Sequence, residues 1–378
     1  MVSEVKSGMV YGIDGELITV QADISEGLPV FYMIGYLSAE VKEAKERVRT
    51  ALKNVGFFLP PKRVAVNLAP ADRKKSGTCF DLAVAVSLLV AMGLIHKEVV
   101  EGTIFLGELA LDGTLLSIDG VLPILYSAER EGIHRCVIPI DNVEEASLLE
   151  EINIIGVHNL REVFEYLTGN TKEKLDMRGV ELCDDYDRTK DFPNKVEDIC
   201  EKIIPDFRDV RGQRMAKRAI EIAVAGYHNL FLEGPPGAGK SMLASCIPGI
   251  MPQMTIDEII DTTMIYSVKG LLKKRGISVG RRPYRSPGPS ISMAGMFGGG
   301  NVPKPGEISL AHHGILFTGE SPFSQQSGIR KYVETAETRA FLASTILNVW
   351  HELLQDQGKS KNRKTRWGEN VRRYVRNI

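Results

Sequence analysis

The feature that most constrains this chain is the octapeptide GPPGAGKS at residues 234–241, which matches the pattern GxxxxGK[ST] in full. An apolar run at 229–232 precedes it and an apolar segment at 242–247 follows it. The sequence therefore predicts a strand, a glycine-rich loop and a helix in that order. Three glycines allow the loop backbone to curl until successive N–H groups point inward. Because these groups lie at the N-terminus of a helix, the loop is predicted to hold an anion.

The residues that end this loop favour a nucleoside triphosphate as the anion. Lys240 is placed to reach the β- and γ-phosphates of ATP, and the hydroxyl of Ser241 to ligate Mg²⁺. We therefore expect ATP and Mg²⁺ as cofactors, with Lys240 also contributing to catalysis. The expected nucleotide-binding residues are Gly234, Pro235, Pro236, Gly237, Ala238, Gly239, Lys240, Ser241 and Met242.

Hydrolysis of ATP also needs a carboxylate near the metal, and the apolar run at 314–317 leads to Glu320. P-loop ATPases of this kind usually end such a strand with Asp-Glu, in which the Asp serves the metal and the Glu orients water. Gly319 stands where the Asp is expected. Glu320 is thus a candidate catalytic residue, and the sequence supports ATP binding more strongly than ATP hydrolysis.

The 378 residues are enough for two or three domains, and the first part alternates strand and helix patterns. Strand patterns cover 16–22, 29–34, 63–68, 103–106 and 136–139, and helix patterns cover 39–55, 80–92 and 119–132. This alternation predicts an α/β domain over residues 1–170. A polar stretch predicts a linker at 171–200. The stretch 206–225 then opens a second α/β domain at 201–325 with the amphipathic helix pattern RMAKRAIEIAVAG, which starts at Arg214. A tail follows at 326–378, and its last 20 residues carry eight lysines and arginines against one glutamate.

Composition narrows the class of protein. Hydrophobic residues make up 43% and charged residues 25% of the chain, which are ordinary values for a globular protein. The five cysteines are odd in number and lack the spacing of a metal site, so we expect reduced thiols in a cytoplasmic protein. The sequence shows neither a signal peptide nor an apolar run long enough for a membrane span, so we expect no membrane partner.

Several longer segments resemble the YifB/ComM family of bacterial magnesium-chelatase-like AAA+ ATPases over roughly residues 1–320. In the first domain, the segments similar to that family's Lon-protease-like module, a ribosomal S5 domain 2-like fold, are 41–57, 62–72, 80–89 and 107–113. In the second domain, the segments similar to its magnesium-chelatase ATPase core are 209–242, 266–272, 281–287 and 298–317.

The resemblance implies a function and an assembly. Intact members of the family are expected to form homo-oligomeric, hexameric rings and to couple ATP hydrolysis to DNA remodelling, as in branch migration during natural transformation. DNA is therefore a possible partner. Two alternatives stay open: a truncated module that binds ATP without turnover, and the motor subunit of a magnesium chelatase, against which the Lon-like domain argues.

The chain departs from the family pattern at several points. Gly288 and Pro289 stand where a His pair usually follows RRPYRSP, and Gly319 replaces the metal-site Asp. After Glu320 the remaining length is too short for the rest of the ATPase core, an arginine finger and a helical lid. We therefore expect a truncated chain with a divergent basic tail, and whether it is an enzyme stays open.

A Lon-like fold also raises the hypothesis of Ser-Lys proteolysis. In the related proteases a serine precedes the long apolar helix and a lysine follows the GELALDG-like turn. Here Gly77 stands at the position of the nucleophile, between Ser76 and Thr78, and residues 120–129 contain no lysine. We therefore predict that the chain is not a peptidase.

Other polar residues admit two interpretations each. His312 and His313 precede the apolar run at 314–317 and can either sense nucleotide or line a hairpin. Asp81 and Glu108 are candidates for buried polar groups, for which structural hydrogen bonding is favoured over catalysis. A third group, rich in arginine, can contact nucleic acid, lie in a solvated loop or contact a neighbouring subunit of an ATPase ring. Its residues are Arg281, Arg282, Tyr284 and Arg285.

Overall fold

The computed structural model describes residues 2–169, 205–272, 279–288, 290–300, 303–318 and 341–342. The fold is mixed α/β, and its largest element is a sheet of seven strands in the order β3-β4-β2-β1-β5-β8-β9. Four of the six strand pairings are parallel. The strands are β1 (Ser3–Tyr11), β2 (Asp14–Ser25), β3 (Phe31–Ile34), β4 (Arg63–Ala69), β5 (Thr103–Phe105), β8 (Arg135–Pro139) and β9 (Asn153–Val157).

β1 lies inside the sheet, between its antiparallel partner β2 and its parallel partner β5. Two serines of β1 are buried, and each donates a hydrogen bond to a main-chain carbonyl of a distant segment. Ser3 Oγ lies 2.8 Å from Ser87 O, and Ser7 Oγ lies 3.0 Å from Phe105 O. These bonds satisfy the hydroxyl groups without water and tie β1 to its neighbours.

Helices pack on this sheet, and one extended hydrophobic core fills the space between them. α2 (Asp81–Ala91) packs on β1 and β2, and α1 (Ala39–Val55) packs on α2. α1 begins after Ser38, whose side chain accepts a hydrogen bond from Val41 N, and ends at a left-handed glycine, as a well-capped helix does. The remaining helices of this part are α3 (Lys97–Val100), α4 (Val121–Arg130), α5 (Val143–Ala146) and α6 (Leu160–Thr168). A two-stranded sheet joins β6 (Glu108–Leu109) to β7 (Leu115–Leu116).

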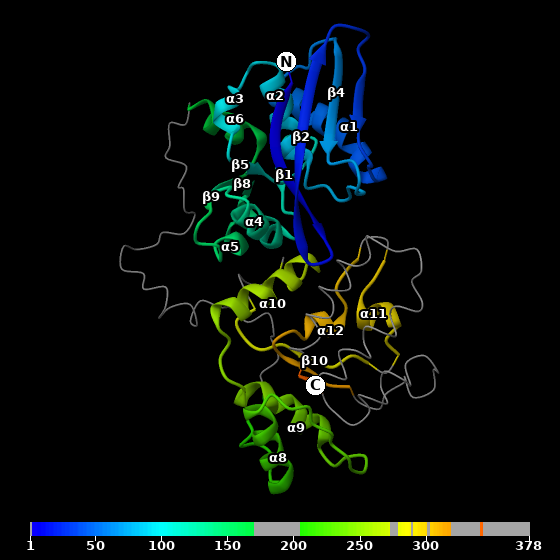
Figure 1. The fold of residues 1–378 in the computed structure, drawn as a ribbon, viewed down its shortest axis with the longest axis vertical. Coiled ribbons are helices and arrows are strands. Elements are labelled where there is room, and N and C mark those ends of the chain that lie inside the picture. Colours follow the sequence, from blue (N-terminus) through cyan, green and yellow to red (C-terminus); the bar gives the residue numbers. More distant parts are fainter. Residues whose placement is uncertain are drawn as a thin grey trace.

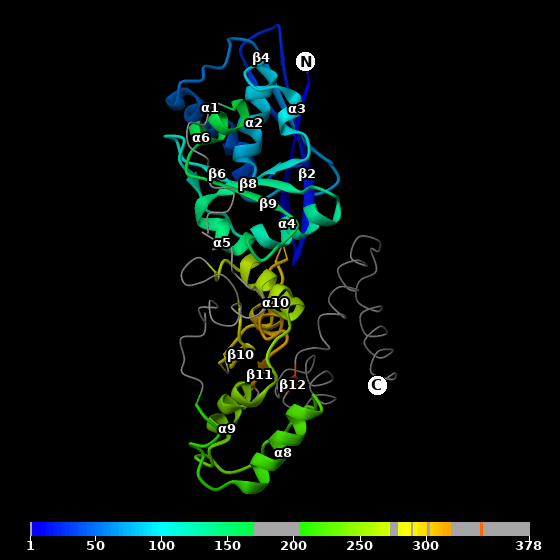
Figure 2. The same ribbon diagram turned by 90° about the vertical axis from the view of Figure 1, so that its left-hand side faces the viewer.

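The second half contains five described helices and a small sheet. The helices are α8 (Arg214–Ala225), α9 (Lys240–Cys246), α10 (Ile256–Val268), α11 (Met293–Phe297) and α12 (Glu307–Leu310). In the sheet, β11 (Ile315–Leu316) runs parallel to β10 (Tyr284–Arg285) and antiparallel to β12 (Phe341–Leu342). α8 and α9 lie at the end of the molecule away from the seven-stranded sheet, while α10 lies next to it (Figures 1 and 2).

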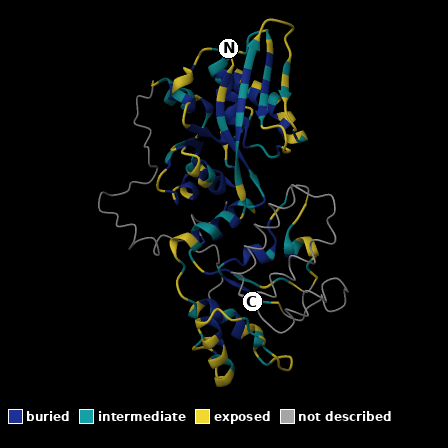
Figure 3. Cartoon of the chain, viewed as in Figure 1, coloured by how far each residue is buried: buried dark blue, intermediate teal, exposed yellow. Residues whose placement is uncertain are grey.

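α10 connects the two halves of the chain. It packs on α4, and Met264 contacts the core beneath the seven-stranded sheet. From the first half, Ile13 in the turn between β1 and β2 packs against a buried cluster of the second half that includes Ile265 and Tyr266. Burial is deepest within the first half, whereas much of α8 is exposed (Figure 3).

One expectation for the second half is corrected and another is confirmed. In the run predicted as a strand at 229–232, only Leu230 is in a β-bridge, and the described sheet of this half consists of β10, β11 and β12. The amphipathic helix predicted from the pattern RMAKRAIEIAVAG is α8 (Arg214–Ala225). In the segment before it, the Asp206 carboxylate accepts a hydrogen bond from Arg208 N at 2.8 Å and stabilises a turn.

Several expectations lie outside the described residues. These are the whole of the predicted linker at 171–200, the pair Gly319 and Glu320, and the tail at 326–378 apart from β12. None of the helices in the described ranges combines the length and the apolar character that a membrane crossing requires.

Candidate nucleotide-binding site

The glycine-rich loop has the backbone that its sequence predicts. Gly237 and Gly239 have φ angles of 82° and 83°, in the left-handed region where a Cβ would be strained. Gly239 caps α9, and Leu243 N donates to Gly239 O at 2.9 Å as the first bond of the helix. The N–H groups of the first turn of a helix have no partner within that helix. The loop thus leads directly to a set of main-chain donors that can bind an anion.

Lys240 is the first residue of α9, and its side chain turns back over the loop. Its Nζ donates to Gly234 O at 2.6 Å and to Pro235 O at 3.1 Å. The loop itself is largely exposed, as are Ser241 and Met242 on the first turn of the helix. The ammonium group is therefore held at the loop, where a phosphate group would meet it from solvent.

A contact that the motif alone does not predict joins α8 to the loop. Gln213 caps the N-terminus of α8 with a φ of 51°, and its Nε2 lies 3.4 Å from Ala238 O. Sequence reasoning did not select Gln213, although it lies within the segment 209–242 that resembles the ATPase core. Its amide links the start of α8 to the fifth position of the octapeptide.

A small hydrophobic cluster fixes α9 against α8 and β11. Its buried members are Val210, Ile220, Val224, Leu243, Ala244, Cys246, Ile247 and Ile315. Ile315 belongs to β11, so the strand that leads toward Glu320 shares a core with the helix that carries Lys240. The structure thus packs β11 against α9, the helix that follows the glycine-rich loop, but describes neither Gly319 nor Glu320.

The interpretation of the arginine-rich segment as a nucleic-acid surface is wrong for Arg282. Its side chain is only 6% exposed and pairs with Glu258, the closest contact being 3.0 Å from Nη2 to Oε2. The same guanidinium donates to Pro252 O at 2.6 Å and to His313 O at 2.8 Å. Its donors are therefore committed to the interior of the protein.

The neighbouring residues are also engaged inside the molecule. Arg285 forms two hydrogen bonds of 2.7 Å with the carboxylate of Glu307. Tyr284 stacks on Phe317 with ring centroids 6.4 Å apart, and burial raises the pKa of its hydroxyl to about 12. Of the four residues of this set, Arg281 is exposed.

Two polar residues of the first half have the structural roles expected of them. Asp81 is fully buried and forms two hydrogen bonds with Arg47, at 2.8 Å to Nε and 3.0 Å to Nη2. Leu109 N also donates to the Asp81 carboxylate, whose pKa burial raises to about 6. Glu108 accepts a hydrogen bond from Thr78 Oγ1 at 2.5 Å. The absence of peptidase activity stays a prediction.

Comparison with known proteins gives two family matches and several relatives. The family described as magnesium chelatase, subunit ChlI, matches residues 206–340, and a second family, subunit ChlI of Mg-chelatase, matches residues 20–142. Competence protein ComM of Haemophilus influenzae is 38% identical over 330 residues, which cover 86% of this chain and 62% of that protein. The uncharacterized protein YifB of Escherichia coli is 37% identical over 313 residues, covering 82% of this chain and 58% of that protein.

The α/β fold, the glycine-rich loop and these matches place the chain in the magnesium-chelatase-like AAA+ class. Within that class, the chain belongs to the YifB/ComM family. It spans 62% of the length of ComM and 58% of the length of YifB. Lon protease 2 of Borreliella burgdorferi is also similar, at 27% identity over 176 residues that cover 43% of this chain and 22% of the protease.

One expectation about the extent of the resemblance is corrected. The first family match continues to residue 340, past the end of the resemblance expected near residue 320. It therefore overlaps the first part of the tail predicted at 326–378. The domain boundaries stay predictions.

Proposed function

We propose that this chain binds ATP with Mg²⁺ through residues 234–242. The observation that carries the proposal is the position of Lys240 Nζ, which lies 2.6 Å from Gly234 O at the start of α9. Contacts with neutral carbonyls are weaker than charge-assisted bonds with phosphate, so this lysine can exchange them for the β- and γ-phosphates. The donors of the first turn of α9 supply further anion contacts, and Ser241 supplies a hydroxyl ligand for Mg²⁺.

We further propose that the chain acts in a homo-oligomeric, hexameric ring that remodels DNA at the expense of ATP. The support is its family membership and its similarity to a protein named for competence. In this proposal Glu320 orients the attacking water. β11 supports this role, because it shares a hydrophobic core with α9 and leads toward Glu320.

A second candidate function is an ATP-binding module that does not turn ATP over. The observation that favours it is Gly319, which stands where a metal-binding Asp is expected. A third candidate is the motor subunit of a magnesium chelatase, which the names of the two matching families favour.

The test of the first proposal compares ATP binding by the full chain with binding by Lys240→Ala. Lys269→Ala is a matched control, because Lys269 Nζ also donates to a main-chain carbonyl, Pro305 O at 2.8 Å, on a different segment. We expect a loss of about 10- to 100-fold in ATP affinity for Lys240→Ala, from the charge-assisted bonds removed, and no loss for the control. Absence of ATP binding by the folded chain would overturn the proposal.

Measurement of ATP hydrolysis distinguishes the candidate functions. ATP hydrolysis that single-stranded DNA stimulates and Lys240→Ala abolishes supports the DNA motor. Stoichiometric retention of ATP without hydrolysis supports the binding module instead. Binding of a chelatase partner without DNA favours the third candidate.

A further inference from the structure

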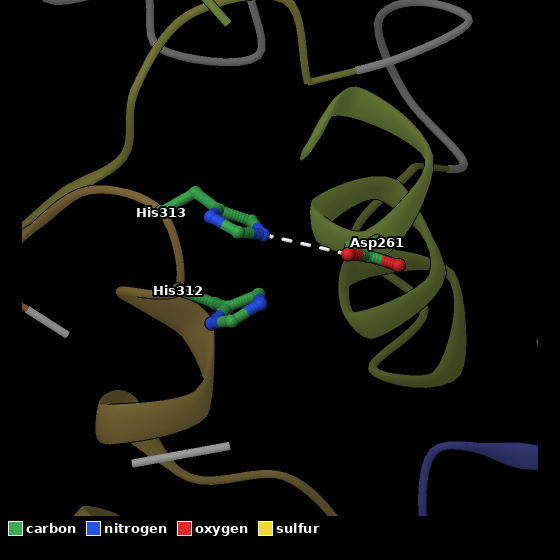
Figure 4. Close-up of side chains that lie close together, drawn as sticks. All are labelled: Asp261, His312 and His313. Carbon is green, nitrogen blue, oxygen red and sulfur yellow. Dashed lines mark hydrogen bonds and ion pairs between the residues drawn. The ribbon is translucent and has the colours of Figure 1, made fainter. Parts of the chain in front are cut away.

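A second group of chemically reactive side chains lies on α10 and on the turn before β11. Asp261 comes from α10, and His312 and His313 come from the turn (Figure 4). One ligand atom from each residue can be chosen so that all three lie within 4.8 Å of one another. The closest approach to the carboxylate is 3.4 Å, between His313 Nε2 and Asp261 Oδ2.

The backbone brings both imidazoles to the same side. Successive residues of an extended chain point in opposite directions, but His313 adopts a left-handed conformation with a φ of 53°. The rings of His312 and His313 consequently lie side by side, with centroids 3.8 Å apart. A left-handed conformation is uncommon for a residue other than glycine, and such strain concentrates at functional sites.

A nearby carboxylate orients one of the two rings. Glu258 lies one turn before Asp261 on α10, and its Oε1 is 3.5 Å from His313 Nδ1. Glu258 is itself held by Arg282 at 3.0 Å and by Thr255 N at 2.9 Å. Metal-binding histidines usually donate their second ring N–H to such a carboxylate. His313 is thus arranged with Nδ1 toward Glu258 and Nε2 toward Asp261.

We propose that Asp261, His312 and His313 form a site for Zn²⁺. Two imidazoles and one carboxylate are a ligand set that suits this ion, with a water molecule at the fourth position. Tetrahedral ligands of zinc lie about 3.3 Å apart, as bond lengths of about 2.0 Å require, so the ion draws the three groups together. The Asp261 side chain is 48% exposed, so close packing does not fix it in one position. Zinc bound by these residues links the turn before β11 to α10.

The same geometry also fits a simple ion pair, in which a protonated His313 lies between Glu258 and Asp261. The two assignments differ in what they need from His312. An ion pair of His313 needs no second imidazole, whereas a metal site loses a ligand when His312 is replaced. They also differ in whether the protein takes up a metal at all.

The experiment titrates the chelator-treated, nucleotide-free full chain with Zn²⁺ by calorimetry and with Co²⁺ by visible absorption. We expect one ion per chain at this site, a Co²⁺ spectrum without a thiolate band, and a loss of at least tenfold in affinity for Asp261→Asn, His312→Ala and His313→Ala. His158→Ala is the matched control, because His158 Nδ1 lies 3.2 Å from Glu162 in an exposed pair on another segment. This control retains the affinity of the parent chain.

Two results would overturn the proposal. One is the absence of Zn²⁺ binding by the parent chain, which leaves the ion pair as the explanation. The other is undiminished affinity in Asp261→Asn, the decisive variant because its half-exposed side chain can change without opening the core. Circular dichroism verifies the fold of each variant. Lys240→Ala retains Zn²⁺ binding, which separates this site from the nucleotide loop.

Discussion

Ser267 on α10 donates a hydrogen bond to the carboxylate of Glu145 on α5, and this bond joins the two halves of the chain. Glu145 also accepts a hydrogen bond from Leu122 N at the start of α4, at 3.0 Å. Burial raises the pKa of Glu145, as expected for a carboxyl group removed from water. One buried side chain therefore caps a helix of the first half and anchors a helix of the second.

Replacing Ser267 with alanine is expected to lower the free energy of unfolding by about 1 to 3 kcal/mol, because a buried carboxyl group loses a donor. Urea unfolding of the full chain measures the change. Ser147→Ala is the control, since Ser147 Oγ donates to Glu144 O in an exposed setting. Equal losses in the two variants would contradict the importance of the contact between the halves.

Replacing Arg47 with alanine is expected to cost about 3 to 5 kcal/mol of unfolding free energy, because the fully buried carboxylate of Asp81 loses its ion-pair partner. Arg47→Lys restores only part of this loss, since a lysine cannot form both bonds of the guanidinium. Lys45→Ala on the same helix is the control: its pair with Glu46 spans 3.9 Å in solvent, and exposed pairs contribute at most about 1 kcal/mol. A loss for Arg47→Ala no larger than for this control would show that the buried pair is dispensable.

The pH dependence of stability is expected to carry the signature of Asp81. Its pKa is near 3.8 without the fold and about 6 within it, so the folded chain binds more protons between these values. The free energy of unfolding of the chain is then expected to fall as pH rises through this window. The expected fall is about 3 kcal/mol, because one pKa unit corresponds to about 1.4 kcal/mol. The stability of the parent chain relative to Asp81→Asn, measured from pH 4 to 6.5, should fall accordingly.

Asp112 supplies a control of opposite sign for that experiment. A hydrogen bond from Thr114 N lowers the pKa of Asp112, so this residue favours the folded state as pH rises. The stability of the parent chain relative to Asp112→Asn should therefore rise with pH mainly at and below pH 3.8, so this comparison extends below the range used for Asp81. The same trend in both comparisons would refute the assignment to Asp81.

Replacing Gly239 with alanine is expected to destabilise the start of α9 by about 1 to 2 kcal/mol through backbone strain alone. No described atom lies within 4 Å of the added Cβ, so the cost does not come from a clash. Gly234→Ala is the matched control, because it lacks a positive φ and its Cβ meets Ala238 at an ordinary 3.4 Å. Faster hydrogen exchange of residues 240–246 in Gly239→Ala, and not in the control, is the measurement. Equal exchange in both variants would mean that the left-handed backbone is not required there.

The sequence predicted the fold most accurately where a segment contains its own periodic pattern and its own caps. The helix predicted over 39–55 is α1 with the same bounds, because its apolar period and its caps lie within the segment itself. β1 had no such signal, since Ser3 and Ser7 occupy buried positions of the strand. Their partners, Ser87 O and Phe105 O, lie 84 and 98 residues further along the chain.

The candidate site also has parts that the sequence predicted and parts that it did not. The backbone of the loop at 234–241 was predictable because its glycines and the start of α9 lie within one continuous segment. The arginine-rich segment was misread because the partners of Arg282 and Arg285 lie 24 and 22 residues away. The approach of Asp261 to His313, across 52 residues, has no local signal at all.

The position of α10 between the two halves has a consequence for how the chain unfolds. Met264 contacts the core beneath the seven-stranded sheet, while Ile265 and Tyr266, next to it, are buried in a cluster of the second half. Melting this one helix exposes apolar surface on both sides, so neither half gains by unfolding alone. We therefore expect two regions with separate sequence motifs to unfold as one cooperative unit, in a single transition on heating.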